Sequence, residues 1–410
     1  MKKNIAICGM FDMRNYGDLL FPVIAKYRLK EFGYSVIPYA PSNASPGLEV
    51  TTPRAIDELI RENDKVDGVI IGGGYIIHNQ PISKLLNYTN SKEYDNAVSS
   101  TWLGATLSAC LADVPLVWNA PGVPFPFPKQ HLPYVKETIS AASYLSVRDK
   151  GSANLLPAPN NGKVSIIPDP IAELSRIWLK EDLSSSFANF QQRYAATQNK
   201  PILAMHIRDR SLSGIGPEKL ANLIDAFTKK SQHIPILIAL GEAHDDLGTA
   251  QAVSAYMKEA HVVYDDPVNL QEITSVIAHA RMYIGASLHG YIVASSYAIP
   301  SVLIARPSYN KFKGYLDHIG MTKDLMLNWY TAFERAAVLL GESSQCPLPE
   351  SVFQMLDTHW SNIRDALANP QDYAKQRQGF LAAMLRQGIV LEGTSWPLMP
   401  FRLNRNSTGK

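Results

Sequence analysis

Short apolar runs alternate with stretches of helical periodicity along the first 180 residues. Six runs rich in β-branched and aromatic residues predict strands, and the segments between them carry apolar positions at helical spacing. Strands that are apolar on both faces are typical of parallel sheets covered by helices, so this part predicts one Rossmann-like lobe. The expected strands are residues 4–10, 34–40, 66–74, 114–122, 143–149 and 163–170, and the expected helices are residues 18–32, 53–65, 101–113 and 134–142.

The alternation stops in a polar stretch, residues 179–200, and then starts again. We therefore predict an α/β fold of two Rossmann-like domains that face a cleft, each a parallel sheet with helices on both faces. The expected domains are residues 1–180 and 200–340, followed by a helical segment and basic tail over 341–410. Expected strands of the second lobe are residues 201–208, 234–241, 261–266, 281–287 and 300–305, and expected helices are residues 220–230, 249–260, 270–280 and 289–298.

Composition narrows the class of protein. In 410 residues, 46% are hydrophobic and 19% charged, which is enough apolar material for two cores. A formal net charge of +2, with basic residues spread along the chain, argues against nucleic-acid binding. Three widely separated cysteines suggest no disulfide framework and fit a cytoplasmic protein. The longest apolar stretch, residues 281–305, is interrupted by Arg281, His289 and Pro300, so no transmembrane segment is expected.

Ligands of parallel sheets bind where strands end and helices begin, which directs attention to the loops there. After the first expected strand, Asn15 and Gly17 permit a tight turn and Asp18 is expected to cap the following helix. Backbone N–H groups at such a turn hold a phosphate or carboxylate. An anion site and an ordinary capped turn are equally supported by this stretch.

Three glycines follow the third expected strand. Gly73 and Gly74, with Gly72, match neither a dinucleotide fingerprint nor a Walker loop. We interpret them as a place where a ligand approaches the backbone, in preference to a purely structural turn. His78 lies four residues further on; it is a candidate for acceptor or anion binding, although a satisfied structural histidine is slightly favoured.

The first strand of the second lobe ends in alternating basic side chains. His206, Arg208 and Arg210 share one face of an extended chain and suit a phosphate or carboxylate, with solvated edge charges as the alternative. Arg148 and Asp149, at a strand end of the first lobe, are interpreted instead as a structural ion pair or cap. Apart from the aspartate pair in YDDP, residues 264–267, no metal-ligating motif stands at a suitable strand end, and no metal is expected.

A histidine interrupts the apolar stretch over 281–305. Residues 281–286 predict a strand, the sequence SLHG its exit turn, and the residues that follow a buried helix. An unpartnered imidazole is costly in such apolar surroundings, so we favour a position of His289 facing the cleft, for catalysis or ligand binding, over a core histidine.

Several motifs together resemble the polysaccharide pyruvyl transferase family. They are NYGD, IGGG, SVRDKGS, IPDP, ARMYIGASLHGYIVASSYAIPSVLIA and YNKFKGYLDHIGM, in the family's order, over residues 4–321. The resemblance implies a GT-B-like fold, with the acceptor on the N-terminal domain and the donor on the C-terminal domain. It also implies transfer of pyruvate from phosphoenolpyruvate to sugar hydroxyls, which forms a cyclic ketal and phosphate.

The family motif Arg-Leu-His-Gly is carried over residue by residue. Leu288, His289 and Gly290 match it, whereas Ser287 stands where the family has arginine. The resemblance implies a catalytic role for His289 and pairs Arg208 with the family's arginine at the end of the second lobe's first strand. Arg306, after the next strand, is our candidate to supply the charge missing at position 287.

The chemistry of the reaction agrees with these residue types. Phosphoenolpyruvate is a multiply charged anion that needs guanidinium groups, and its addition to a hydroxyl needs proton transfers that histidine performs. We expect His289 and Arg208 to be catalytic, no cofactor besides the co-substrate phosphoenolpyruvate, and a saccharide acceptor, free or lipid-linked. The oligomeric state stays open, as does a peripheral position at the inner membrane surface.

Two alternatives remain at this point. The same frame serves glycosyltransferases that use a nucleotide sugar, and Ser287 also fits a catalytically altered glycan-binding member. In the segment over 119–133, Phe125 and Phe127 lie among prolines. These rings either stack on a sugar or pack within their own loop, and the sequence supports both equally.

Overall fold

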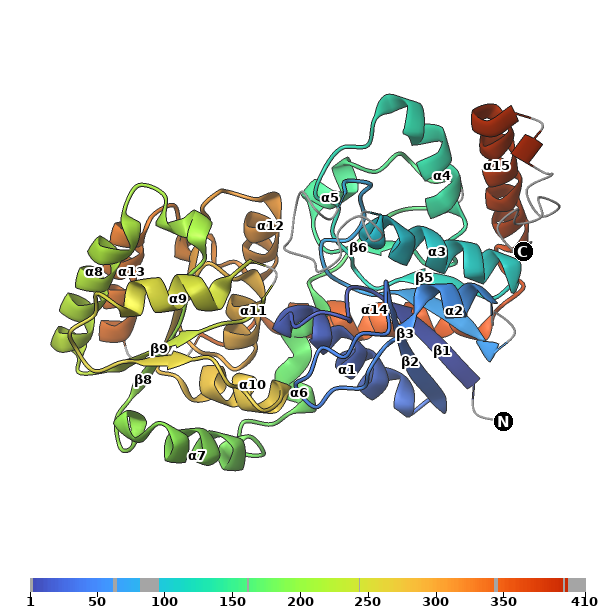
Figure 1. Cartoon of the computed structure of the whole chain (residues 1–410). Helices are drawn as coiled ribbons and strands as arrows, with labels where there is room; N and C mark the ends of the chain where they lie inside the picture. The colour runs from blue at the N-terminus through green and yellow to red at the C-terminus, as the bar shows by residue number, and fades with distance from the viewer. Residues whose placement is uncertain are drawn as a thin grey trace, which may run out of the picture.

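A five-stranded parallel sheet forms the N-terminal lobe of the computed structural model (Figure 1). Its strand order is β3-β2-β1-β4-β5, and the central strands are buried because their residues are apolar in near-continuous runs. The structure describes residues 3–61, 65–81, 96–160, 162–242, 244–342, 346–393 and 395–396. The N-lobe elements are β1 (Lys3–Cys8), α1 (Tyr16–Lys30), β2 (Tyr34–Ala40), β3 (Arg54–Ala55), α2 (Ile56–Arg61), β4 (Gly68–Ile71), α3 (Ala97–Leu111), β5 (Leu116–Trp118), η3 (Lys129–His131), α4 (Leu132–Ser140), β6 (Ser146–Val147), α5 (Lys150–Asn154) and β7 (Ser165–Ile166).

A second parallel sheet, of six strands, forms the C-terminal lobe. Its order is β10-β9-β8-β11-β12-β13, and the ends of β8 and β11 are adjacent because Gly285 pairs with His206. This register places the loops after those two strands side by side. The C-lobe elements are β8 (Ile202–His206), η6 (Asp209–Leu212), α8 (Gly216–Ser231), β9 (Ile234–Ile238), α9 (Asp246–Ser254), β10 (Val262–Tyr264), α10 (Leu270–His279), β11 (Met282–Gly285), α11 (Leu288–Ser296), β12 (Ser301–Ile304), α12 (Asn310–Ile319), η7 (Thr322–Asp324), β13 (Leu325–Met326) and α13 (Trp329–Glu342).

The chain passes between the lobes twice. It leaves the N-lobe through η4 (Pro170–Glu173) and α6 (Leu174–Ile177). The polar stretch that follows contains α7 (Ser184–Arg193) and η5 (Ala195–Thr197), and α7 packs on α10, where the rings of Phe187 and His279 stack 4.6 Å apart. Beyond α13, α14 (Glu350–Ala368) returns to β5, and α15 (Ala374–Glu392) packs on α3 and α4, as Figure 1 shows. The helices α14 and α15 therefore cover the N-lobe, and the predicted basic tail lies outside the described residues.

The two lobes contact each other directly at the first turn of α1. The backbone N–H of Tyr16 donates to the carbonyl of Leu240 at 2.8 Å, and Asn15 forms an antiparallel bridge with Gly241. The hydroxyl of Tyr16 hydrogen-bonds that of Thr274 on α10 at 2.7 Å. One hydrophobic cluster continues from β1 and α1 into α10, α11 and α14. The first turn of α1 is thus fixed against the C-lobe.

In the described part of the chain, no helix is long and apolar enough to span a bilayer.

Candidate functional site

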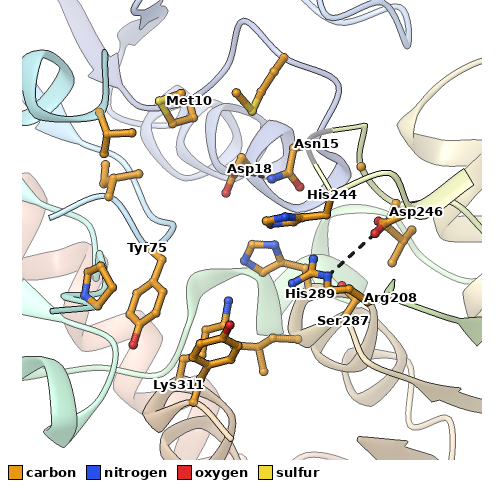
Figure 2. Close-up of a pocket in the computed structure, with 18 of the residues that line it drawn as sticks. Met10, Asn15, Asp18, Tyr75, Arg208, His244, Asp246, Ser287, His289 and Lys311 are labelled. Carbon is orange, nitrogen blue, oxygen red and sulfur yellow. Dashed lines mark hydrogen bonds and ion pairs between the residues drawn. The ribbon is translucent and has the colours of Figure 1, made fainter. Parts of the chain in front are cut away.

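A pocket lies between the lobes, where loops of both sheets meet (Figure 2). The N-lobe contributes Met10, Met13, Asn15, Asp18, Tyr75, Ile76, His78, Val98, Pro124, Phe125 and Arg148. The C-lobe contributes Arg208, Arg210, Leu240, Gly241, His244, Asp246, Ser287, Leu288, His289, Tyr309 and Lys311. The lining is mostly apolar on the N-lobe side, and the C-lobe side contributes three of the four Arg and Lys side chains.

His289 enters the pocket from the first turn of α11. Ser287 caps this helix, since its hydroxyl accepts the N–H of Gly290 at 3.3 Å. The ring rests against Gly17 of α1, where an added Cβ would stand 1.7 Å from His289 Nδ1. Glycine is therefore required at position 17 for the imidazole to approach α1. This contact brings together two residues that the sequence placed in different lobes.

The imidazole of His289 has a carboxylate beside it. Its Nε2 is buried, has no hydrogen-bond partner among the described residues, and lies 4.0 Å from Oδ2 of Asp169. Burial lowers the pKa of His289 well below 6.5, and the positive charges of Arg148 and Lys311 act in the same direction. The ring is therefore neutral near pH 7 and able to accept a proton.

Asp169 has one oxygen engaged and one unpartnered. Oδ1 accepts the N–H of Ile171 at 3.1 Å and so caps η4. Oδ2 has no hydrogen bond in the described structure and lies 3.7 Å from an Arg148 nitrogen. Burial raises the pKa of Asp169, against the opposing effect of Arg148. A buried carboxylate oxygen without a hydrogen bond lowers the stability of the fold. We therefore interpret Asp169 as a group that interacts with a ligand or with the imidazolium of His289.

Arg148 and Lys311 meet over the ring of Tyr75. The Arg148 guanidinium carbon lies 4.5 Å from the ring centroid, and Lys311 Nζ lies 5.0 Å from it. Two guanidinium nitrogens of Arg148 are buried without a hydrogen-bond partner in the described structure. Burial, followed by the charges of Arg148 and Arg208, lowers the pKa of Lys311 well below 10.5. Cations crowded in this way are stabilised by a bound anion.

A second basic group comes from the end of β8 and the loop beyond it. Asp246 joins His206, at 2.9 Å from Nε2, to Arg208, at 3.9 Å from Nε. Arg210 donates to the hydroxyl of Tyr309 at 2.8 Å. Burial, followed by the charge of Arg208, lowers the pKa of His244 to about 3. His206 and Asp246 thus orient the Arg208 guanidinium toward the pocket.

Asp18 is the carboxyl group of the N-lobe side. Its Oδ2 accepts from Asn15 Nδ2 at 2.7 Å. Burial raises its pKa from 3.8 to about 7, although Lys311 and Arg148 act to lower it. Asp18 does not cap the helix as the sequence suggested, because α1 begins at Tyr16 and Asp18 lies within its first turn. It is available as a proton donor near neutral pH.

The pocket brings together eight of the residues predicted from the sequence. They are Asn15, Asp18, His78, Arg208, Arg210, Ser287, Leu288 and His289. Gly17 lies behind His289, Gly290 packs under the Tyr283 hydroxyl, and His206 is fully buried behind Arg208. These three support the lining residues without forming part of the lining.

Two predictions need correction. A Cβ at Gly73 would lie 2.0 Å from the Phe21 ring, and one at Gly74, whose φ is +94°, would lie 3.0 Å from Asp18. These glycines therefore make room for the protein's own side chains, and they do not line the pocket. Arg306 does not line it either, because its guanidinium is held at the hydroxyl of Ser213, 3.3 Å away.

Sequence reasoning missed several lining or supporting residues. Arg148 and Asp149 were interpreted as a structural ion pair or cap, and they do lie 3.6 Å apart, with Asp149 capping α5 through the N–H of Ser152 at 2.6 Å. That interpretation missed that Arg148 also lines the pocket. Asp169 and Lys311 stood inside the IPDP and YNKFKG motifs without being singled out. The sequence signals that were available are the position of Asp169 directly before a proline and the position of Lys311 after two polar residues.

Comparison with solved structures identifies the fold. The UDP-GlcNAc 2-epimerase of Neisseria meningitidis bound to UDP-GlcNAc is 12% identical, with 94% of this chain and 100% of that chain covered and a TM-score of 0.50. The S. aureus MnaA–UDP structure is 12% identical, covers 85% and 92%, and has a TM-score of 0.53. The UDP-N-acetylglucosamine 2-epimerase of Rickettsia bellii is 12% identical, covers 91% and 99%, and has a TM-score of 0.53. The predicted GT-B-like α/β fold is confirmed.

Sequence comparison identifies the family. No curated protein matches the chain. The family model described as polysaccharide pyruvyl transferase matches residues 15–308, which is more than half of the chain and includes both lobes. The match begins in the first turn of α1 and includes Arg148, Asp169, Arg208 and His289. The chain belongs to the polysaccharide pyruvyl transferase family.

Proposed function

We propose that this transferase moves pyruvate from phosphoenolpyruvate to two hydroxyls of a sugar in a polysaccharide or its lipid-linked precursor. The observation that carries the proposal is the convergence of basic side chains around a neutral histidine between the lobes. Arg148, Arg208, Arg210 and Lys311 line one pocket with His289. A small anion with a phosphate and a carboxylate matches this arrangement.

The cations account for donor binding. Arg148 and Lys311 face the pocket from two different lobes, so an anion between them neutralises charges that now repel each other. A bound anion raises the pKa of the Lys311 amine again and so favours its charged form. Arg208, oriented by Asp246, provides a further contact for the phosphate or the carboxylate.

The acids and bases account for the proton transfers. In the proposed reaction, Asp18 donates a proton to the methylene carbon of the donor, and C2 becomes electrophilic. His289 takes the proton from the attacking sugar hydroxyl, and Asp169 stabilises the resulting imidazolium. The C–O bond to phosphate then breaks, phosphate leaves, and a second hydroxyl closes the ketal while its proton passes to phosphate or solvent. One phosphoenolpyruvate and one diol thus give one ketal and one phosphate.

A transfer assay tests this function. The protein is incubated with phosphoenolpyruvate and a panel of bacterial surface glycans, free and lipid-linked, and both phosphate release and acceptor mass are followed. We expect phosphate release that depends on an acceptor, together with a mass gain of one pyruvyl ketal. Absence of both for every acceptor would contradict the proposal.

UDP provides the comparison ligand, because two of the structural neighbours above contain UDP or UDP-GlcNAc. A ligand that binds only the folded state raises Tm. We expect phosphoenolpyruvate to raise Tm and UDP to leave it unchanged. Stabilisation by UDP alone would instead favour a nucleotide-sugar donor.

A further inference from the structure

The pocket has one wall of uncharged side chains, on the other lobe from Arg208, Arg210 and Lys311. Met10, Met13, Ile76, Val98, Pro124 and Phe125 line it, and all come from the N-lobe. Figure 2 shows Met10 and Tyr75 on one side and Arg208 and Asp246 on the other, with His289 between them. The charged groups of the donor anion are bound by basic side chains and not by an apolar surface. This side of the pocket is therefore available to a second molecule.

Phe125 is the aromatic ring of that wall. Its side chain is 37% exposed, whereas Phe127 in the same segment is 7% exposed and packs edge-on to Trp102 at 5.9 Å. The two phenylalanines that the sequence left open therefore differ: Phe127 anchors the loop, and Phe125 faces the pocket. Tyr75 is not equivalent, because Arg148 and Lys311 already lie over its ring.

The loop that carries Phe125 is held in place on several sides. The Gly122 N–H donates to the Gly74 carbonyl at 2.7 Å, and the Gly122 carbonyl accepts from Ile77 at 3.2 Å. The Val123 N–H donates to the hydroxyl of Ser152 at 2.9 Å. A ring on a fixed loop loses little conformational freedom when it binds a ligand, which favours recognition by stacking.

His78, which also lines the pocket, packs against the Phe125 ring. The two rings meet edge to face, with centroids 5.8 Å apart. His78 Nδ1 accepts the N–H of Gln80 at 3.1 Å, and burial lowers the pKa of His78 to about 4. The imidazole is therefore neutral at physiological pH, and the Phe125 wall stays without charge.

From this geometry we infer that Phe125 is the platform on which a neutral sugar ring of the acceptor stacks. The ring presents its C–H-rich face to the phenyl group and its hydroxyls toward His289 and the basic wall. Aromatic rings contribute to binding through their large apolar area and their polarised faces. Pyranose rings with several axial C–H bonds fit such a surface. The inference rests on the proposed function for the identity of the ligand as acceptor.

Saturation-transfer NMR tests the inference without turnover. The probes are methyl glycosides of neutral hexoses and N-acetylhexosamines, with phosphoenolpyruvate in the same samples. We expect the ring C–H protons of at least one glycoside to receive saturation from the parent protein. Phe125→Ala should weaken this binding by about three- to tenfold, and Phe125→Trp should restore it.

Phe32→Ala is the matched control, because Phe32 is also exposed, at 39%, and lies outside the pocket. We expect it to behave as the parent. Equal saturation of the glycoside in Phe125→Ala and parent, or no glycoside signal in the parent, would overturn the inference. If the parent protein gives a glycoside signal but no phosphoenolpyruvate signal, the proposed donor is wrong and the inference about Phe125 is not affected. Failure of the inference and failure of the proposed function are therefore distinguishable.

Discussion

At the scale of single residues, the site depends on pKa values displaced in opposite directions. Asp18 keeps its proton to about pH 7, and His289 stays neutral well below its ordinary pKa. The same burial has both effects, because it disfavours whichever form carries charge. An acid and a base are thereby available together near neutral pH.

Replacement of His289 tests the proposed base. In His289→Asn we expect kcat to fall by about 10²- to 10⁴-fold, because general base catalysis is lost. Binding of phosphoenolpyruvate should change much less, since the cations remain. The matched control is His261→Asn, whose ring contacts Ser254 outside the pocket. A variant at position 289 that retains parental kcat would exclude the histidine from proton transfer.

The raised pKa of Asp18 predicts a dependence on pH. The folded protein holds a proton that the unfolded chain releases above pH 3.8, so stability falls as pH rises from about 4 to about 7. Asp18→Asn removes this loss, and we expect a Tm a few degrees above the parent at pH 8 and no gain at pH 4. Thermal scans across pH measure it. A Tm difference that is the same at both pH values would refute the assigned titration.

The same group limits activity. We expect kcat of the parent to decline above pH 7 as Asp18 loses its proton, and this limb to be absent from the small residual activity of Asp18→Asn.

At the scale of elements, the sequence predicted the strands and helices better than the side-chain contacts between them. The apolar runs located β1, β8 and β11, because a buried parallel strand reads as hydrophobic in any context. The side-chain contacts across the pocket leave no comparable pattern in the sequence. Gly73 resembled a ligand-binding glycine, yet Phe21 fills the space beside it. Arg148 was interpreted as one half of a local ion pair, which the structure contains, but nothing in the chain reveals that Lys311 and Tyr75 also approach it from elsewhere.

The contact between α1 and α11 provides a test at this scale. Alanine is a better helix former than glycine, so Gly17→Ala favours α1 locally by up to about 1 kcal/mol. Its methyl group would nevertheless overlap the His289 ring. We expect turnover to be lost in a protein that still folds, as measured by circular dichroism and the transfer assay. Gly341→Ala, a helical glycine with open space around it, is the control and should retain activity. Full activity of Gly17→Ala would contradict the close packing of the two helices.

At the scale of the whole molecule, polar contacts join distant segments of the chain at the point where it leaves the N-lobe. Glu173 is fully buried where the chain leaves the N-lobe; it binds the guanidinium of Arg28 on α1 and accepts from Trp360 Nε1 on α14 at 2.7 Å. Arg28 also contacts Asp357 at 2.7 Å. These residues are 145 or more positions apart in sequence, so no local pattern revealed them.

Loss of this network should destabilise both lobes at once. In Glu173→Ala we expect a cost of about 1–3 kcal/mol, since the partly buried Arg28 keeps Asp357 but loses Glu173, and buried Trp360 loses its acceptor. Calorimetry should show one unfolding transition at a lower Tm, because a single hydrophobic cluster spans both lobes. Glu242→Ala, which removes a largely exposed ion pair with Arg14, should change stability little. Separate transitions for the two lobes would contradict the shared core.

Calorimetric titration with phosphoenolpyruvate tests the central claim, that the basic pocket between the lobes binds this donor. We expect one site in the parent, and an affinity about 10- to 100-fold lower in Lys311→Ala or Arg148→Ala, because each loses a charge-assisted contact. Lys313→Ala, on the same helix and outside the pocket lining, should bind as the parent does. Parental affinity in both pocket variants, or no binding of phosphoenolpyruvate by a folded parent protein, would contradict the account.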